Sequence, residues 1–168
     1  VEGTWLDTQI IWFNRSQGGI AGDNVLGALV PDASAGTSII VNRGFVPTGS
    51  TIPGPRSGHV ELLGRVRLPQ ARRTGELTDT HDGPLTEVRR VDVGLIAEEL
   101  PGDVPPLYLD VSDAVPARDA QDPTPTPEPT LDEGPHLSYA MQWVIFSACV
   151  VIGWVLAVRR SISTHRAA

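Results

Sequence analysis

The chain has 168 residues and a formal net charge of −7, which arises from 13 arginines, no lysine and 20 acidic residues. That length suits one modest domain with appendages. Residues 1–136 hold all 20 acidic residues against 10 arginines, a balance of −10, and so acidic a domain argues against nucleic-acid binding.

The first 115 residues are short apolar stretches separated by Gly and Pro, which predicts a β-rich domain. The first two strand candidates are residues 4–13 and 24–30. A third, 38–41, is rich in β-branched residues and runs into Asn42-Arg43-Gly44. Asn and Gly favour turn geometry, so we predict a turn there, with Arg43 held at the strand end.

Two further stretches alternate between apolar and polar residues, as half-buried strands do. In residues 59–68 the predicted inward face consists of Val60, Leu62, Val66 and Leu68, with Glu61, Arg65 and Arg67 outward and Gly64 as a candidate bulge. In residues 106–113 the alternating residues are Leu107, Leu109 and Val111 against Tyr108 and Asp110.

One helix is predicted over residues 93–100, capped by Asp92 and ended by Pro101-Gly102. Strands at short spacing with a single short helix predict a mainly antiparallel β domain of the α+β class over residues 1–115. Residues 116–136 contain six prolines and few apolar side chains, so we predict an extended, semi-rigid tether.

Residues 137–158 predict a transmembrane helix, since they are 22 residues without a charge and would span roughly 33 Å of a hydrocarbon core about 30 Å thick. Tyr139, Trp143 and Trp154 lie where interfacial aromatics are expected. The basic tail, residues 159–168, places the C-terminus in the cytoplasm by the positive-inside rule and the acidic domain outside. A buried helix of a soluble protein is the alternative.

Small side chains recur every four residues in this helix, at Cys149, Gly153 and Ala157. Such a stripe lets a second helix approach closely, although small residues are common in membrane helices by chance. We therefore treat these three residues as candidate partner contacts.

Few residues carry recognisable chemistry. The chain contains no GxSxG, GxGxxG or HExxH motif, and a P-loop needs a lysine that this chain lacks. The single cysteine excludes an intrachain disulfide or a CxxC site. We therefore do not expect an enzyme. His136 precedes the membrane helix and shares a helical face with Ala140 and Trp143, so it is either an interfacial histidine or a haem ligand.

Two stretches together resemble a known family. "IIVNRGFVP" (39–47) resembles the signature of the Surfeit locus 1 family, the cytochrome c oxidase assembly proteins, with Phe45 where the family usually has Trp. "HLSYAMQWVIF" (136–146) resembles the start of that family's last membrane helix, and "LYLDVSD" (107–113) resembles one of its strands. The resemblance spans most of residues 1–158.

The resemblance implies a bacterial membrane protein that assists maturation of haem-copper oxidase, with its main domain outside the plasma membrane. The arginine-rich composition points to a high-GC organism. The chain starts at Val1 and its only methionine is Met141, so we expect that it is not a whole translated chain. The resemblance implies a further N-terminal transmembrane helix that is missing from it. Membrane lipid and oxidase subunits, within a larger respiratory complex or not, are the expected partners.

Haem a is the candidate cofactor. It would be bound by His136 through the iron, with Tyr139, Trp143 and Arg43 as further contacts, while Asn42, Arg43 and Gly44 are candidate partner contacts. For Arg43 the alternative is an ion pair with an acidic residue of its own domain. The alternatives for the whole protein are a permanent accessory subunit of the oxidase without haem transfer, and an anchored sensor unrelated to respiration.

Overall fold

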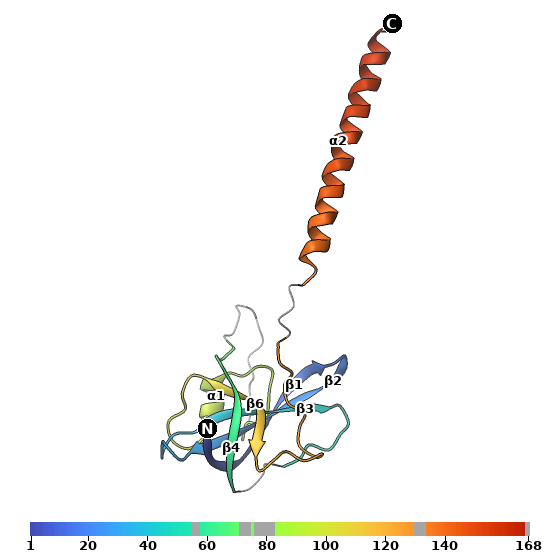
Figure 1. Cartoon of the computed structure of the whole chain (residues 1–168). Coiled ribbons are helices and arrows are strands. Elements are labelled where there is room, and N and C mark those ends of the chain that lie inside the picture. The colour runs from blue at the N-terminus through green and yellow to red at the C-terminus, as the bar shows by residue number, and fades with distance from the viewer. Residues whose placement is uncertain (55–57, 71–74, 76–82, 130–133, 167–168) are drawn as a thin grey trace. The chain divides into compact units, whose positions relative to one another are not determined.

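The computed structural model describes residues 1–54, 58–70, 75, 83–129 and 134–166 (Figure 1). The chain forms two compact units, Val1–Pro127 and Glu128–Ala168. The first unit contains all the strands and a short helix, in the order β1 (Glu2–Gln17), β2 (Ile20–Pro31), β3 (Ile39–Pro47), β4 (His59–Arg67), β5 (Glu87–Val88), α1 (Val93–Ala97) and β6 (Tyr108–Val115). The second unit contains α2 (His136–Arg166).

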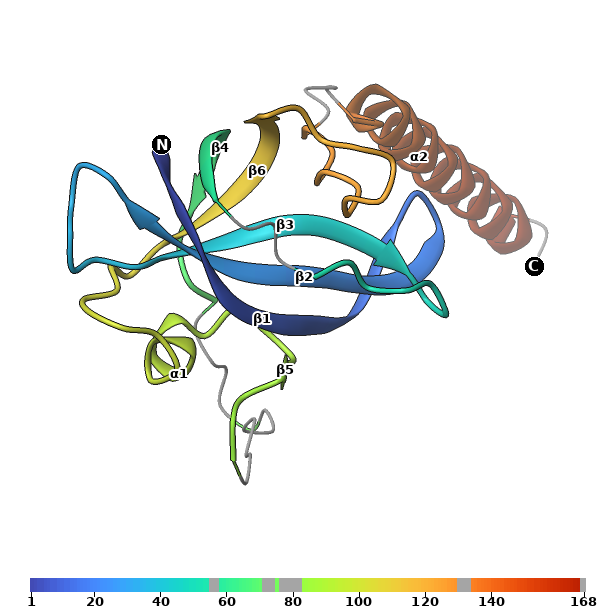
Figure 2. The ribbon, with the colours of Figure 1, turned by 90° about the horizontal axis from the view of Figure 1, so that it is seen from below.

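The strands form a closed barrel. Their order is β2-β3-β6-β4-β1-β5, and an additional pairing of β1 with β2 joins the sheet to itself through five strands. Four pairings are antiparallel, whereas β3–β6 and β1–β5 are parallel. In Figure 2, β4 and β6 lie on one side of β3, and α1 and β5 lie on the other. The prediction of a mainly β domain is therefore confirmed.

Two apolar cores follow from the alternation of side chains along the strands. The first fills the barrel and draws on all five of its strands: Leu29, Val41, Val60, Leu62, Leu109 and Val111, with Trp5 packed against them. The second lies under α1 and includes Ile10, Trp12, Leu26, Ile40, Val88, Ile96 and Tyr108. Neighbours such as Ile40 and Val41 enter different cores, so β3 and β6 are buried on both faces.

The predicted inward face of residues 59–68 is only half right. Val60 and Leu62 are each 3% exposed, but Val66 and Leu68 are 65% and 79% exposed. The reason is that β1 pairs with β4 only over His59–Glu61, so the second half of β4 has only β6 beside it among the described strands.

The bulge predicted at Gly64 occurs instead on the opposite strand, β6. Leu63 pairs with Asp113 and Gly64 pairs with Val111, so the extra residue is Ser112 on β6. Gly64 nevertheless has a packing role, since a Cβ there would come within 2.3 Å of the Asp110 carbonyl oxygen.

The helix predicted over residues 93–100 is confirmed, but its regular part is shorter at the C-terminal end. Asp92 caps α1, and its carboxylate accepts a hydrogen bond from the Leu95 amide at 3.3 Å. The regular helix ends at Ala97, and the next turn tightens into i→i+3 hydrogen bonds, from Glu99 to Ile96 and from Leu100 to Ala97.

The first unit extends beyond the boundary predicted at residue 115. It reaches Pro127, because the segment from Pro116 to Pro127, here called the strap, packs on the barrel. Thr124 and Phe45 exchange two main-chain hydrogen bonds, of 2.7 and 2.8 Å. A proline-rich segment with few apolar side chains can still dock, because its main-chain carbonyls remain free to accept hydrogen bonds.

α2 is long and apolar enough to cross a membrane. Its span His136–Arg160 contains an apolar stretch with a mean hydropathy of 2.1, and none of the residues in that stretch is buried. The predicted apolar run, residues 137–158, lies within it, and the helix continues through the basic tail to Arg166. Trp143 and Phe146 contact each other edge to face, with ring centroids 6.1 Å apart.

Candidate functional site

Asn42-Arg43-Gly44 is a bulge inside a strand, not the predicted turn. Leu26 pairs with Asn42 and Val25 pairs with Gly44, so Arg43 is the extra residue on β3. The ladder resumes at once with Phe45 opposite Asn24. A bulge of this kind re-aims one side chain while the strand continues, and here that side chain is Arg43.

The residues on either side of Arg43 favour the bulge. Gly44 has φ +131°, which side chains rarely adopt, and a Cβ there would lie 2.2 Å from the Thr124 carbonyl oxygen. The Asn42 Oδ1 accepts a hydrogen bond from the Gly44 amide at 3.2 Å. Asn42 and Gly44, which predicted a turn, therefore stabilise a bulge instead.

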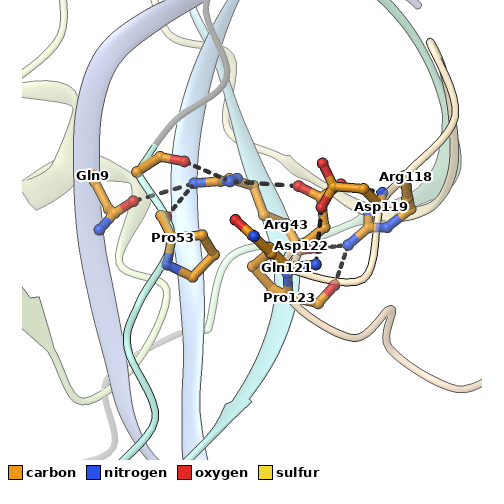
Figure 3. A network of polar contacts seen from close by, with 9 residues as sticks. Gln9, Arg43, Pro53, Arg118, Asp119, Gln121, Asp122 and Pro123 are labelled. Carbon is orange, nitrogen blue, oxygen red and sulfur yellow. Dashed lines mark hydrogen bonds and ion pairs between the residues drawn. The ribbon is translucent and has the colours of Figure 1, made fainter.

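The Arg43 side chain joins three parts of the first unit (Figure 3). Its Nη1 donates to the Gln9 Oε1 at 3.1 Å and to the Pro53 carbonyl at 3.2 Å, and its Nη2 donates to the Gly54 carbonyl at 2.9 Å. The Asp122 carboxylate of the strap lies 3.9 Å from Nη2. Arg43 is only 4% exposed, so these groups hold a buried charge between β1, the loop after β3 and the strap.

The main chain of Arg43 is also bound by the strap. The Arg118 Nη2 donates to the Arg43 carbonyl at 2.6 Å and to the carbonyl of Pro123. Farther along, the Gln17 Nε2 donates to the Pro125 carbonyl at 3.1 Å. The first part of the predicted tether is thus anchored to the barrel, and side-chain donors of Arg118 and Gln17 contribute to the attachment.

Asn42 organises a second polar network, on the other face of β3. Its Nδ2 donates to the Asp110 carboxylate at 2.8 Å and to the Thr126 hydroxyl at 3.2 Å. Its Oδ1 accepts a hydrogen bond from the Asn24 side-chain Nδ2 at 3.2 Å. Asp110 is 4% exposed and also accepts from the Arg67 Nε at 2.9 Å. This network fixes the end of the strap to β3 and β6.

The pKa of Tyr108 is affected by its burial and by Asp110 of this network. Its burial, and then the nearby negative charge of Asp110, raise the pKa of the Tyr108 phenol above its usual value. Its ring packs edge to face against Trp12, with centroids 6.4 Å apart.

A small cavity lies beside Arg43. Its lining includes Trp5, Val60, Leu62, Arg118 and Asp122. Its volume is about 20 Å³, enough for about one water molecule. The Trp5 Nε1 is buried without a hydrogen-bond partner among the described residues. A ligand as large as a porphyrin does not fit in this cavity.

The predicted site residues fall into two groups in separate units. Asn42, Arg43 and Gly44 belong to the barrel. The others lie on α2 with exposed side chains: His136, Tyr139, Trp143, Cys149, Gly153 and Ala157. Their contacts with haem or a partner stay predictions.

Sequence reasoning missed the partners of Arg43 and Asn42. These partners lie between 34 and 84 residues away in the chain from the residues that they contact: Gln9, Arg118, Asp122 and Thr126. The last three also lie in a proline-rich stretch that has no recognisable motif. No local pattern marks them. Only the acidic character of the domain indicated that Arg43 could find a carboxylate.

A protein-family model for the SURF1 family matches residues 1–148. The chain belongs to the SURF1 family. This is the Surfeit locus 1 family, which is linked to cytochrome c oxidase assembly. The match spans the barrel, the strap and the start of α2, and ends just before Cys149. Comparisons with curated proteins and with solved structures find no match.

We expect the substitution Arg43→Lys to destabilise the barrel of this SURF1 protein by about 2 kcal/mol, since hydrogen bonds to charged groups contribute about 1.5–3 kcal/mol each. Lysine keeps the charge but loses the planar fork that reaches the Gln9, Pro53 and Gly54 oxygens together. Urea unfolding followed by tryptophan fluorescence measures the change.

The control is Arg15→Lys. Arg15 is exposed, and its guanidinium carbon lies 4.2 Å from the Trp12 ring centroid, where a lysine ammonium can also sit. That variant should stay within about 0.5 kcal/mol of the wild type. Equal stability of both variants and the wild type would show that the Arg43 fork contributes nothing to folding.

Proposed function

We propose that this protein is a membrane-anchored assembly factor for haem-copper cytochrome c oxidase, acting in haem a insertion or subunit maturation. The observation that carries the proposal is the SURF1 family match over residues 1–148. The match includes both the folded domain and the start of a helix suited to a membrane, so it favours a whole anchored factor over a shared β domain alone.

The proposed location is the bacterial plasma membrane, with the barrel outside the cytoplasm and the C-terminus inside. Arg159 and Arg160 follow the apolar run directly, and no arginine or lysine occurs in residues 119–158. Basic residues flanking a membrane helix stay on the cytoplasmic side. This charge asymmetry supports the orientation.

Binding, rather than catalysis, is the proposed mode of action. The polar groups around Arg43 and Asn42 bond to one another and to main-chain atoms, and the cavity beside them has room for about one water molecule. Such an arrangement supports a rigid domain that presents its surface and its helix to a partner.

Haem a, in this proposal, is held on α2 rather than in the barrel. The barrel interior is filled with apolar side chains, and the cavity beside Arg43, at about 20 Å³, is far below the 300–1,000 Å³ of ordinary cofactor pockets. His136 is exposed at the start of α2, and Trp143 lies seven residues on, so both face the same side of a helix. Imidazole is a common axial ligand of haem iron.

The second candidate function is a permanent accessory subunit of the oxidase, without haem transfer. The exposed stripe of Cys149, Gly153 and Ala157 favours it, because such a stripe allows close packing against another membrane helix. The same stripe would also serve a transient partner, so the distinction depends on haem.

Deleting the gene should lower the amount of assembled haem a-containing oxidase while transcripts of its subunits stay unchanged. The reason is that an assembly factor acts after synthesis of the subunits. Membrane difference spectra and oxidase activity measure the loss, and a plasmid copy of the intact gene should restore both. Normal spectra in the deletion strain would contradict both candidate functions.

Replacing His136 by Ala should reduce the haem that copurifies with the protein, because the iron would lose its imidazole ligand. Pyridine haemochrome spectra of the detergent-purified protein measure the haem content. The neighbouring variant Ser138→Ala is the control and should keep its haem. Full haem content in the His136 variant would exclude this residue as the ligand, and a haem-free wild type that copurifies with oxidase would favour the accessory subunit.

A reporter fused after Ala168 should behave as a cytoplasmic protein. The arginines at positions 159 and 160 oppose export of that end. Alkaline phosphatase and green fluorescent protein fusions give opposite signals on the two sides and so check the orientation. Phosphatase activity at this site would reverse the topology and remove the barrel from the outer face.

A further inference from the structure

Three potential metal ligands meet on the barrel surface, apart from the Arg43 and Asn42 networks. Glu2, Asp32 and His59 each offer a ligand atom, and these atoms all lie within 4.8 Å of one another. The His59 Nε2 lies 2.7 Å from the Asp32 Oδ2. All three side chains are exposed, so an ion from solution can reach them.

The main chain holds the three residues in place. Glu2 and Gly3 of β1 pair with Glu61 and Val60 of β4, and Thr4 pairs with His59. The Asp32 amide donates to the Glu2 carbonyl at 3.1 Å. The ligands thus come from the start of β1, the residue after β2 and the start of β4, all of which are fixed by the sheet.

The register also produces an unfavourable charge pair at this place. Glu2 lies directly opposite Glu61 in the antiparallel pair, on the same face as His59. Like charges directly opposite each other destabilise a sheet. Within the cluster, His59 is the one ligand that is not a carboxylate, and a bound cation would offset the negative charge of Glu2 and Asp32.

We propose that Glu2, Asp32 and His59 form a surface site for a divalent transition-metal ion of the Zn²⁺ class. One imidazole nitrogen and two carboxylate oxygens suit such an ion better than Mg²⁺ or Ca²⁺, which prefer oxygen ligands alone. Solvent water completes the coordination. The acidic surface of residues 1–136 adds a favourable long-range potential for cations.

The geometry requires only a small adjustment. Zinc lies about 2.0–2.2 Å from nitrogen and oxygen ligands, so tetrahedral ligand atoms stand about 3.4 Å apart. The separations in the cluster, up to 4.8 Å, close by rotamer changes of exposed side chains while the strands stay fixed. The ion would tie the ends of β1, β2 and β4 together.

Calorimetric titration of the full chain in detergent with ZnCl₂, in a buffer that does not bind zinc, tests the site. The wild type should bind zinc at this site, and the binding should also raise the melting temperature of the barrel. His59→Ala and Asp32→Asn should each weaken this binding at least tenfold and abolish the thermal shift. The control Glu98→Gln, which removes an exposed carboxylate at the end of α1, should change neither.

Circular dichroism of each variant without metal confirms that its barrel is folded, and two separate ligand variants guard against a folding defect in one of them. Failure of the wild type to bind zinc would overturn the proposal. So would binding that survives in both His59→Ala and Asp32→Asn, since the zinc would then be held elsewhere. The oxidase-assembly function is tested separately and stands or falls independently of this site.

Discussion

The first unit depends on the burial of one arginine. Arg43 is the extra residue of a bulge, and the bulge turns its guanidinium into the end of the barrel. Removing a charge from water costs several kcal/mol unless hydrogen bonds and counter-charges replace the water. The oxygens of Gln9, Pro53 and Gly54, with the Asp122 carboxylate, provide that replacement. Each comes from a segment that the arginine therefore holds in place.

The strap is secured on both faces of β3 as a result. On the face of Arg43 it contributes Asp122 and the Arg118 side chain, and on the face of Asn42 it contributes Thr126. Between these contacts Thr124 bonds to the main chain of Phe45. A segment whose composition predicts an extended, semi-rigid tether is instead part of the domain, so only residues from 128 onward separate the barrel unit from α2 in the chain.

The packing of the barrel bears on how such a protein can act. A closed five-stranded barrel has little interior space, and here apolar side chains from every strand occupy it. The interior then offers little room for a ligand, so other molecules can reach this protein at the exposed faces of the barrel unit and of α2.

The sequence by itself determined the features that depend on neighbours a few residues apart. The β-rich domain, the cap of α1 by Asp92, the apolar run of α2 and the family motif all follow from local periodicity, turn chemistry and residue order. These features are decided within one strand or one helix, so one sequence suffices to see them.

Only the tertiary structure decided the features that depend on pairing between distant segments. An Asn and a positive-φ Gly beside an arginine suit a turn and a bulge equally, and the register of β2 against β3 selects the bulge. Val66 was expected inside because it follows the alternation, but burial also needs a neighbouring strand, and β1 pairs with β4 only up to Glu61. The strap looked like a tether because its docking uses hydrogen bonds to residues tens of positions away, which leave no periodic trace in the sequence.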